Sequence, residues 1–222
     1  MEKKYVALKR SFTELLVKSY LTNGQIDTGT EKKSIKSLIS REFLNFDELF
    51  AEIKPVIFDY YFTRKYPKHP KFIQVITSDN IHGELSSAVK ELVIKTGTQS
   101  MFSTARQLLN AFNLVDESGN LSTGNSDVAK EIVGIAKKSE GKNVDVKDII
   151  TMLETSAFGY HRLMTEFIIT VLTYNGEITL KAAGGKTITS SEVEEVFKSG
   201  LSAFENIRYI AIEGDFDIQS VI

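Results

Sequence analysis

Residues 143–190 read NVDVKDIITMLETSAFGYHRLMTEFIITVLTYNGEITLKAAGGKTITS, and this stretch decides the fold. Its first part predicts a helix that begins after Asp145, because an aspartate in the N-cap position accepts hydrogen bonds from the free amides of the first turn. That helix ends near Glu154, and a turn around Gly159 leads into a second helix over about 161–174. Two helices joined by a short turn are the helix–turn–helix of many binding domains.

A predicted hairpin follows the second helix. Strands at 177–181 and 186–189 flank the Gly184-Gly185 pair, where a turn needs positive φ. Because side chains alternate along a strand, the first strand should bury its even-numbered residues and expose Thr179 and Lys181. Helix–turn–helix followed by a hairpin is the outline of a winged helix, which binds nucleic acid or protein. The predicted fold class is therefore mainly α with a small β-hairpin.

Helical periodicity also dominates the rest of the chain. Further helices are predicted at 3–21, 34–39, 46–65, 82–95 and 99–114, and at 127–138 as the first helix of the winged helix. Pro55 should kink the third of these or start a new helix. The polar, Gly-containing run 116–126 is the best candidate for a domain boundary. The predicted organisation is therefore a helical domain at 1–115, a linker at 116–126 and a winged-helix-like domain at 127–222.

Two further patterns lie after the hairpin. Ser191 and Glu194 have the spacing of a capping box and predict a helix that runs to about Lys198. Weak alternation over 207–213 predicts a last strand.

Composition excludes several classes of protein. The chain has 222 residues, of which 42% are hydrophobic, and it contains no cysteine, so it has neither a disulfide framework nor a thiolate metal site. No apolar run approaches the roughly 18 residues of a membrane span. The Lys-rich N-terminus is not followed by the apolar segment of a secretion signal. We therefore expect a cytoplasmic protein without a membrane partner.

Charge is spread unevenly along the chain. Residues 1–78 hold 14 Lys and Arg against 9 Asp and Glu, a net charge of +5. Residues 127–190 hold 8 of each sign, and residues 191–222 hold 2 against 7, a net charge of −5. Domains dedicated to DNA are usually basic, because phosphate contacts dominate their affinity. The neutral winged-helix stretch is not typical of that class.

The segment AAGGKT at 182–187 falls short of a phosphate-binding loop. Such a loop has the pattern G-x-x-x-x-G-K-[ST], and its first glycine would fall on Leu180, inside a predicted strand. A helix should also begin at Lys186, whereas Ile188 and Thr189 are β-branched. The pattern favours the turn of a wing, and we expect no nucleotide cofactor.

Other candidate chemistry is sparse. The three histidines, His69, His82 and His161, lack the spacing of a metal site, and His69, near two prolines, is better interpreted as a packed or capping residue. Asp215 and Asp217 imitate part of a calcium loop without its other oxygen ligands. The sequence therefore predicts no catalytic, cofactor or metal residues, and we do not expect an enzyme.

Several short motifs resemble one protein family. These are Phe158-Gly159-Tyr160, the helix end at 171–178, the segment 197–210, and Tyr66-Pro67-x-His69-Pro70. Over about 46–212 they resemble the C-terminal region of large P-loop proteins of BREX and phage-growth-limitation defence systems, in which an ATPase domain precedes helical and winged-helix regions. The resemblance implies a fragment or remnant of such a protein that lacks the ATPase.

Two binding functions remain open. Leu163, Phe167 and Val171 lie on a broad apolar stripe of the second helix that should face the core. The residues of its other face are Tyr160, His161, Arg162, Thr165, Glu166, Ile169 and Thr173. Few of them belong to the residue types that read base edges. We therefore expect contact with protein subunits of a larger complex, with non-specific binding of duplex DNA as the alternative. The predicted contact residues are Lys137, Lys138, Lys142, Lys147, His161, Arg162, Lys181 and Lys186.

Overall fold

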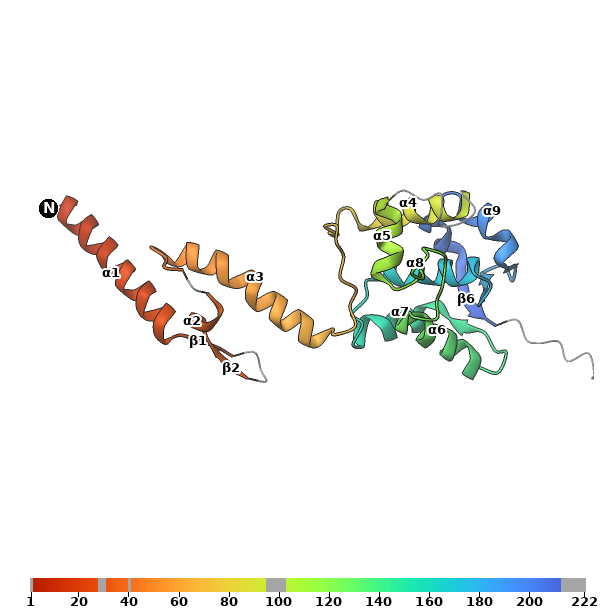
Figure 1. Cartoon of the computed structure of the whole chain (residues 1–222), viewed down its shortest axis with the longest axis horizontal. Coiled ribbons are helices and arrows are strands. Elements are labelled where there is room, and N and C mark those ends of the chain that lie inside the picture. The colour runs from red at the N-terminus through yellow and green to blue at the C-terminus, as the bar shows by residue number, and fades with distance from the viewer. Residues whose placement is uncertain (1, 28–30, 40, 95–102, 213–222) are drawn as a thin grey trace, which may run out of the picture. The chain divides into compact units, whose positions relative to one another are not determined.

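A computed structural model of the chain describes residues 2–27, 31–39, 41–94 and 103–212. The chain divides into two compact units, a first unit of residues 1–67 and a second unit of residues 68–222. Both are mainly helical, and each contains one small antiparallel sheet (Figure 1). The predicted class, mainly α with small β elements, is confirmed.

The first unit is a pair of long helices around a short hairpin. Its elements are α1 (Glu2–Asn23), β1 (Gln25–Asp27), β2 (Lys32–Ser34), α2 (Ile35–Leu38) and α3 (Phe46–Lys65). Its small core consists of Val17, Ile35, Ile39, Phe43, Leu49 and Ile53. Asn45 caps α3 by accepting a hydrogen bond from the Glu48 amide at 2.9 Å. The helix then continues through Pro55 as one element and does not restart there.

The second unit has the larger core and, among the described residues, contains six α-helices, four strands and two 3₁₀ turns. The helices among them are α4 (Ile81–Ile94), α5 (Ser103–Ala111), α6 (Asp127–Lys138), α7 (Val146–Thr155), α8 (Arg162–Tyr174) and α9 (Val193–Phe197). The strands are β3 (Val144–Asp145), β4 (Thr179–Ala182), β5 (Thr187–Ile188) and β6 (Ile207–Ala211). Two 3₁₀ turns, η2 (Ser190–Glu192) and η3 (Leu201–Asn206), flank α9.

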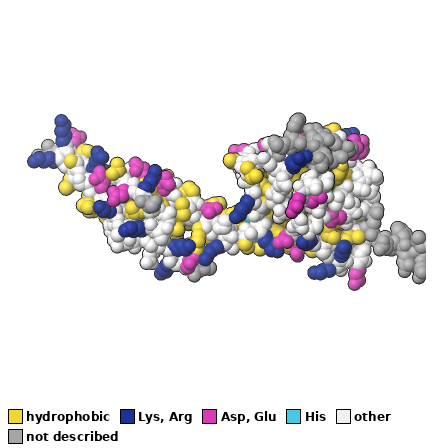
Figure 2. Space-filling model, in the orientation of Figure 1, with side chains coloured by type: hydrophobic (Ala, Val, Ile, Leu, Met, Phe, Trp, Pro, Cys, Tyr) yellow, Lys and Arg dark blue, Asp and Glu magenta, His cyan; other side chains and the backbone are white. Residues whose placement is uncertain are grey.

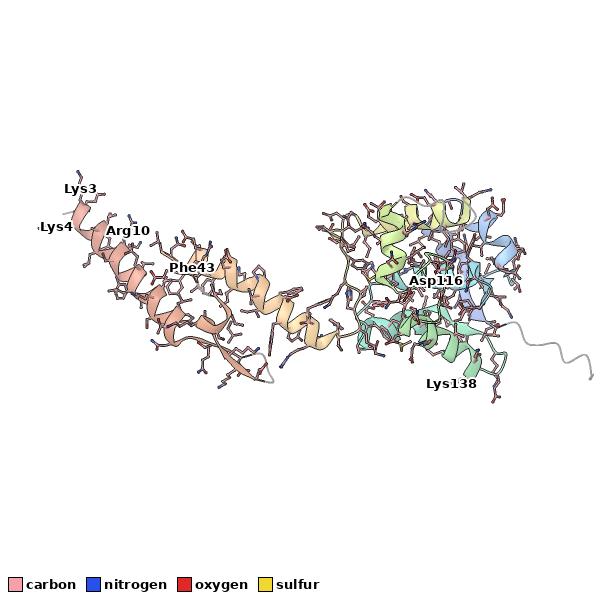
Figure 3. The ribbon with its side chains drawn as sticks, viewed as in Figure 1. Lys3, Lys4, Arg10, Phe43, Asp116 and Lys138 are labelled. Atoms are coloured by element: carbon pink, nitrogen blue, oxygen red, sulfur yellow. The ribbon has the colours of Figure 1, made fainter. Side chains whose placement is uncertain are left out.

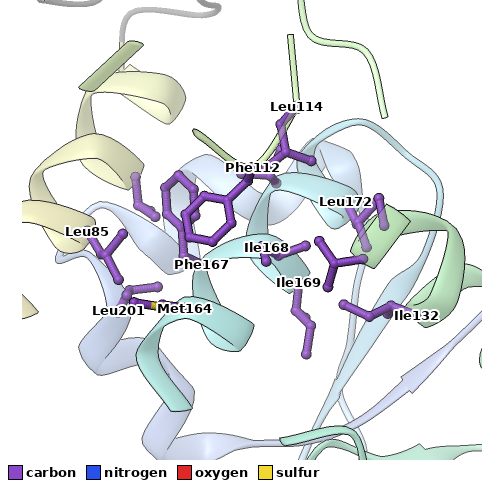
Figure 4. Close-up of a cluster of buried hydrophobic side chains, with 14 of the residues drawn as sticks. Leu85, Phe112, Leu114, Ile132, Met164, Phe167, Ile168, Ile169, Leu172 and Leu201 are labelled. Atoms are coloured by element: carbon purple, nitrogen blue, oxygen red, sulfur yellow. The ribbon is translucent and has the colours of Figure 1, made fainter. Parts of the chain in front are cut away.

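Helix α8 is the centre of the second unit. Every residue from Met164 to Thr173 is buried, because α8 contacts α4 as well as α6, α7, α9 and η3 (Figure 1). Figure 4 shows Leu85 of α4 and Phe112 beside Phe167 on α8. Two of the three buried threonines of α8 keep their hydrogen bonds: the Thr170 and Thr173 hydroxyls donate to the carbonyls four residues earlier, at 2.9 and 2.8 Å. The buried Thr165 hydroxyl has no hydrogen-bond partner among the described residues. A helix that is buried on all sides is a core helix.

The predicted open face of this helix is therefore wrong. Tyr160, Thr165, Glu166, Ile169 and Thr173 are each at most 3% exposed. The sequence pattern showed one broad stripe, but it could not show that α4, α9 and η3 also pack against this helix. Of the face expected to be open, His161 and Arg162 remain exposed, at the first turn.

The sheet of the second unit has the order β3-β6-β4-β5 and is antiparallel throughout. The hairpin predicted from the glycine pair exists: Leu180 pairs with Ile188, and Gly185 has a φ of +81°. The last strand, β6, lies between β3 and β4 in the sheet and pairs with both, with Ile210 opposite Val144 and Leu180. The order α6–β3–α7–α8–β4, with β6 paired between β3 and β4, follows the outline predicted from the sequence, and β5, α9 and η3 lie between β4 and β6 along the chain.

Burial along β4 departs from simple alternation. Leu180 is fully buried, as predicted, and Lys181 is half-buried. Thr179, expected to be exposed, is buried, and its hydroxyl donates to the Ala211 carbonyl at 3.3 Å.

Residues 116–126, predicted to be a linker, lie inside the second unit. Val115 and Leu121 form an antiparallel bridge, and the Ser122 amide donates to the Leu114 carbonyl at 3.0 Å. Ser126 is fully buried and caps α6 by accepting from the Ala129 amide. The polar run is thus a tight turn tied to the core, and the compact units divide after Pro67 instead.

The capping box after the hairpin lies two residues earlier than predicted. The Thr189 side chain accepts from the Glu192 backbone, while the Glu192 carboxylate accepts from the Thr189 amide at 2.9 Å. Ser191 and Glu194 have the same spacing, but the 3₁₀ turn η2 has already begun at Ser190.

Two of the short motifs meet in one aromatic cluster of the second unit. The His69 ring stands edge-on to Tyr160 at 5.8 Å between ring centroids, and Tyr160 is edge-on to Phe158 at 5.3 Å. The Lys68 amide donates to the Ala157 carbonyl at 3.1 Å, which fixes the segment before α4 against the turn before α8. These motifs therefore have a structural role, because they pack the segment before α4 against the turn between α7 and α8.

Candidate partner-contact site

The basic residues predicted for partner contact fall into separate groups. Lys137 and Lys138 end α6, and Lys142 follows in the next turn, all of them exposed. Figure 3 shows Lys138 pointing away from the body of the unit. None of these three lysines belongs to an ion pair among the described residues. They form an exposed basic end of α6.

Lys147 and Arg162 meet at a cavity of about 440 Å³ between α7, the start of α8 and the η3–β6 connection. Its wall is partly apolar, because Val146, Ile150 and Phe204 contribute to it. The charged residues of the lining are the bases Lys147, Arg162 and Arg208 and the acids Asp145, Glu166 and Glu205. We call this the α7–α8 cavity.

Glu166 is the buried acid of the α7–α8 cavity. Its side chain is 3% exposed and accepts a hydrogen bond from Arg162 Nε at 2.6 Å, while the Arg162 side chain is 61% exposed. Burial raises the pKa of Glu166, and the Arg162 guanidinium offsets part of that rise. A buried carboxylate is therefore neutralised by a cation at the rim of the cavity.

Two other residues near the cavity serve the ends of the helices. The Asp145 carboxylate accepts from the Lys147 amide at 2.8 Å, which confirms its predicted N-cap role. His161 Nδ1 accepts from the Leu163 amide at 3.2 Å and caps α8. The His161 ring therefore has a structural role at the start of α8.

Sequence reasoning missed Glu166 as a site residue and missed Arg208 entirely. The spacing of Arg162 and Glu166, four residues apart on a helix, is the signal that could have paired them. Arg208 has no local signal, because it reaches the cavity through pairing of β6 with β3, more than sixty residues away in sequence.

The glycine-rich segment is a hairpin, not a loop that opens a helix. Lys181 pairs with Thr187 across the turn, and Lys186 Nζ lies 3.7 Å from Glu192 Oε1. Lys186 borders a different hollow, together with Ala182 and Val196, so it does not join the α7–α8 cavity. Phosphate-binding loops present backbone amides at a helix N-terminus, and this geometry does not.

The other candidates for chemistry behave as packing residues. Desolvation lowers the pKa of His69, and its Nδ1 lies 3.0 Å from the Pro70 carbonyl oxygen, so the predicted packing role is confirmed. No group of three metal-ligating side chains occurs in the described part of the chain. The Asp215 and Asp217 pair lies outside the described residues. Among the described helices, none is both long and apolar enough to cross a membrane.

Comparison with known proteins identifies one family. No curated protein and no solved structure matches this chain. Residues 81–212 match the fourth domain of a family of unknown function (DUF6079), and the match runs from the first residue of α4 to just beyond β6. It therefore contains the whole core around α8 and the entire four-stranded sheet. Because the match covers more than half of the sequence, the chain belongs to the DUF6079 family.

Proposed function

We propose that the chain is a non-catalytic interaction module that docks protein subunits of a larger complex. The observation that carries this proposal is the burial of α8 from Met164 to Thr173. A winged helix that reads DNA lays its second helix in the major groove with side chains free to reach base edges. Here that helix is the core of the unit.

The charges of the α7–α8 cavity favour a protein partner over a phosphate backbone. Three cations and three carboxylates line it, so the local field is close to neutral. A nucleic-acid site depends on uncompensated positive charge. Alternating charges around an apolar wall suit the mixed side chains of a protein surface, where complementary charges set orientation.

The family context extends the proposal. A fourth domain implies further domains in the proteins that define the family. From the motifs that resemble BREX and phage-growth-limitation proteins, we further propose that the chain is a fragment of a phage-defence ATPase that acts in the cytoplasm. An upstream Walker A motif in the same reading frame is the expected observation. A frame without one would overturn this parentage.

Non-specific DNA binding is the second candidate, and the exposed basic end of α6 favours it. Lys137, Lys138 and Lys142 are unpaired among the described residues and lie close together in sequence. Three lysines are nevertheless few, since each phosphate contact adds about one to the salt slope of binding.

Two measurements separate these functions. In a mobility-shift assay with duplex DNA, the protein-docking proposal expects no shift at about 50 mM salt, whereas DNA binding requires affinity that falls steeply with salt. A benzophenone amino acid in place of Lys147, at the cavity, should give discrete protein adducts on irradiation in cells. The same substitution at exposed Lys198, which does not line the cavity, is the control. Adducts to nucleic acid, or identical adducts at both positions, would overturn the proposal.

A further inference from the structure

Helix α1 carries a row of large apolar side chains that remain largely exposed in the first unit, although Tyr20 contacts Phe46 of α3 edge-on. These are Tyr5, Leu8, Phe12, Leu15, Leu16 and Tyr20, which are between 43% and 71% exposed. The face of α1 that packs against α2 and α3 is centred on the fully buried Val17 instead. Figure 2 shows hydrophobic side chains on the surface of this part of the chain. A contiguous apolar surface of this kind marks a site of interaction.

The spacing of these side chains is that of a helix-pairing seam. Tyr5, Leu8, Phe12 and Leu15 follow one another at intervals of three, four and three residues. That repeat places one residue of each turn on a narrow line, which a second helix fills with its own side chains. We call this line the α1 seam.

The charges beside the α1 seam select the partner. From residue 4 onward, the positions that flank the seam are Lys4, Ser11 and Lys18 on one side and Lys9, Leu16 and Asn23 on the other. Three of these six residues are lysines, and none is an acid. No ion pair among the described residues involves these three lysines, and Figure 3 shows Lys4 pointing away from α1. Flanking charges decide pairing between helices, so a second copy of α1 would bring lysine against lysine. Acidic flanks fit.

We propose that α1 docks an amphipathic helix of a partner protein, with apolar residues against the α1 seam and Glu or Asp against Lys4, Lys9 and Lys18. This rests on the proposed function as a protein-docking module and names the chemistry of one partner. An anionic lipid surface would also attract the lysines. The three-four-three spacing, however, is what a second helix requires, and a flat bilayer does not require it.

A designed peptide tests the α1 seam directly. The probe is a fluorescein-labelled peptide of about three heptads, with Leu at the seam positions and Glu at every flanking position. Its own flanking charges repel one another, so it does not pair with itself. Titration with the full chain, followed by fluorescence anisotropy, should show saturable binding that weakens with salt. A peptide with Lys at the flanking positions should bind at least about tenfold more weakly.

Two pairs of variants give the controls. Leu8→Glu places a charge in the seam and should weaken binding at least about thirtyfold, whereas Val6→Glu, 59% exposed on another face of the same helix, should leave it unchanged. The triple variant Lys4→Glu/Lys9→Glu/Lys18→Glu should now prefer the Lys-flanked peptide, while Lys3→Glu should not. All of these positions are exposed, and Glu is a good helix former, so far-UV circular dichroism should be unchanged.

Three results would overturn the proposal. They are peptide binding that Leu8→Glu and Val6→Glu weaken equally, self-association in sedimentation velocity that Leu8→Glu abolishes, and co-sedimentation with phosphatidylserine vesicles without peptide binding. Cross-linking at Lys147 tests the proposed function through the second unit, so the α1 seam can fail while that function stands.

Discussion

Truncation of Phe167 to alanine should destabilise the second unit by about 3–5 kcal/mol. Phe167 is 0% exposed, and its ring lies 5.6 Å from that of Phe112. Loss of the buried ring surface accounts for about 1.5–3 kcal/mol, and loss of the aromatic pair adds about 0.5–1.5 kcal/mol. The remainder comes from the cavity, which cannot collapse because α8 is held on every side (Figure 4).

The assay is urea unfolding of the full chain followed by far-UV circular dichroism, with hydrogen exchange to assign the transition to residues 81–212. Phe12→Ala is the matched control: the same side chain is removed at a position that is 61% exposed, so the change should stay within about 0.5 kcal/mol. A loss below about 1 kcal/mol for Phe167→Ala would refute the central position of α8 and the helix assignment with it.

Further predictions concern the hairpin, the buried acid and one glycine. Neither the wild type nor the Lys181→Glu/Lys186→Glu variant should bind ATP, because the turn is a hairpin; saturable binding in calorimetry that Lys186→Ala abolishes would contradict this. If duplex DNA binds, the same double variant should weaken all sequences about equally and reduce the salt slope by about two. Burial raises the pKa of Glu166 above 4.5, so the folded state holds that proton more tightly than the unfolded chain. Wild type should therefore gain stability relative to Glu166→Gln as the pH falls from above the raised pKa towards 4.5, and a difference independent of pH in urea unfolding would count against the shift. Gly200→Ala should cost more than about 1 kcal/mol, because φ is +84° and a Cβ would lie 2.8 Å from a serine side chain of α4. Gly134→Ala in α6, with nothing within 4 Å of its Cβ, should instead stabilise by about 0.5–1 kcal/mol in thermal unfolding, and equal effects would refute the distinction.

Local signals in the sequence predicted the local structure well. The Asp145 cap, the turn at Gly159 and the hairpin at Gly185 all lie where short-range chemistry places them. Each depends on a few neighbouring residues, and the same residues act in the folded chain.

Long-range packing is what the pattern could not predict. The apolar stripe of α8 predicted one buried face, but burial of the rest of the helix depends on α4, which precedes it by many residues. In the same way, Arg208 of β6 lines the α7–α8 cavity, and no local sequence pattern predicts the pairing of β6 with β3. The run at 116–126 resembled a linker because its composition is polar. The sequence did not predict the backbone bridge between Val115 and Leu121 that ties this run to the core.

The position of β6 between β3 and β4 has a consequence for how the chain is made. Val144 pairs with Ile210, and Thr179 pairs with Ala211, so the sheet can form only after β6 has been synthesised. Its contacts join residues that are far apart in sequence. Such contacts form slowly, because a long loop must close before any of them stabilises the fold. During synthesis, β3 and β4 leave the ribosome with open edges, and an open strand edge is a template for aggregation. A fragment that stops before Ile207 would keep both edges open, so an expressed piece of this domain has to extend beyond Ala211.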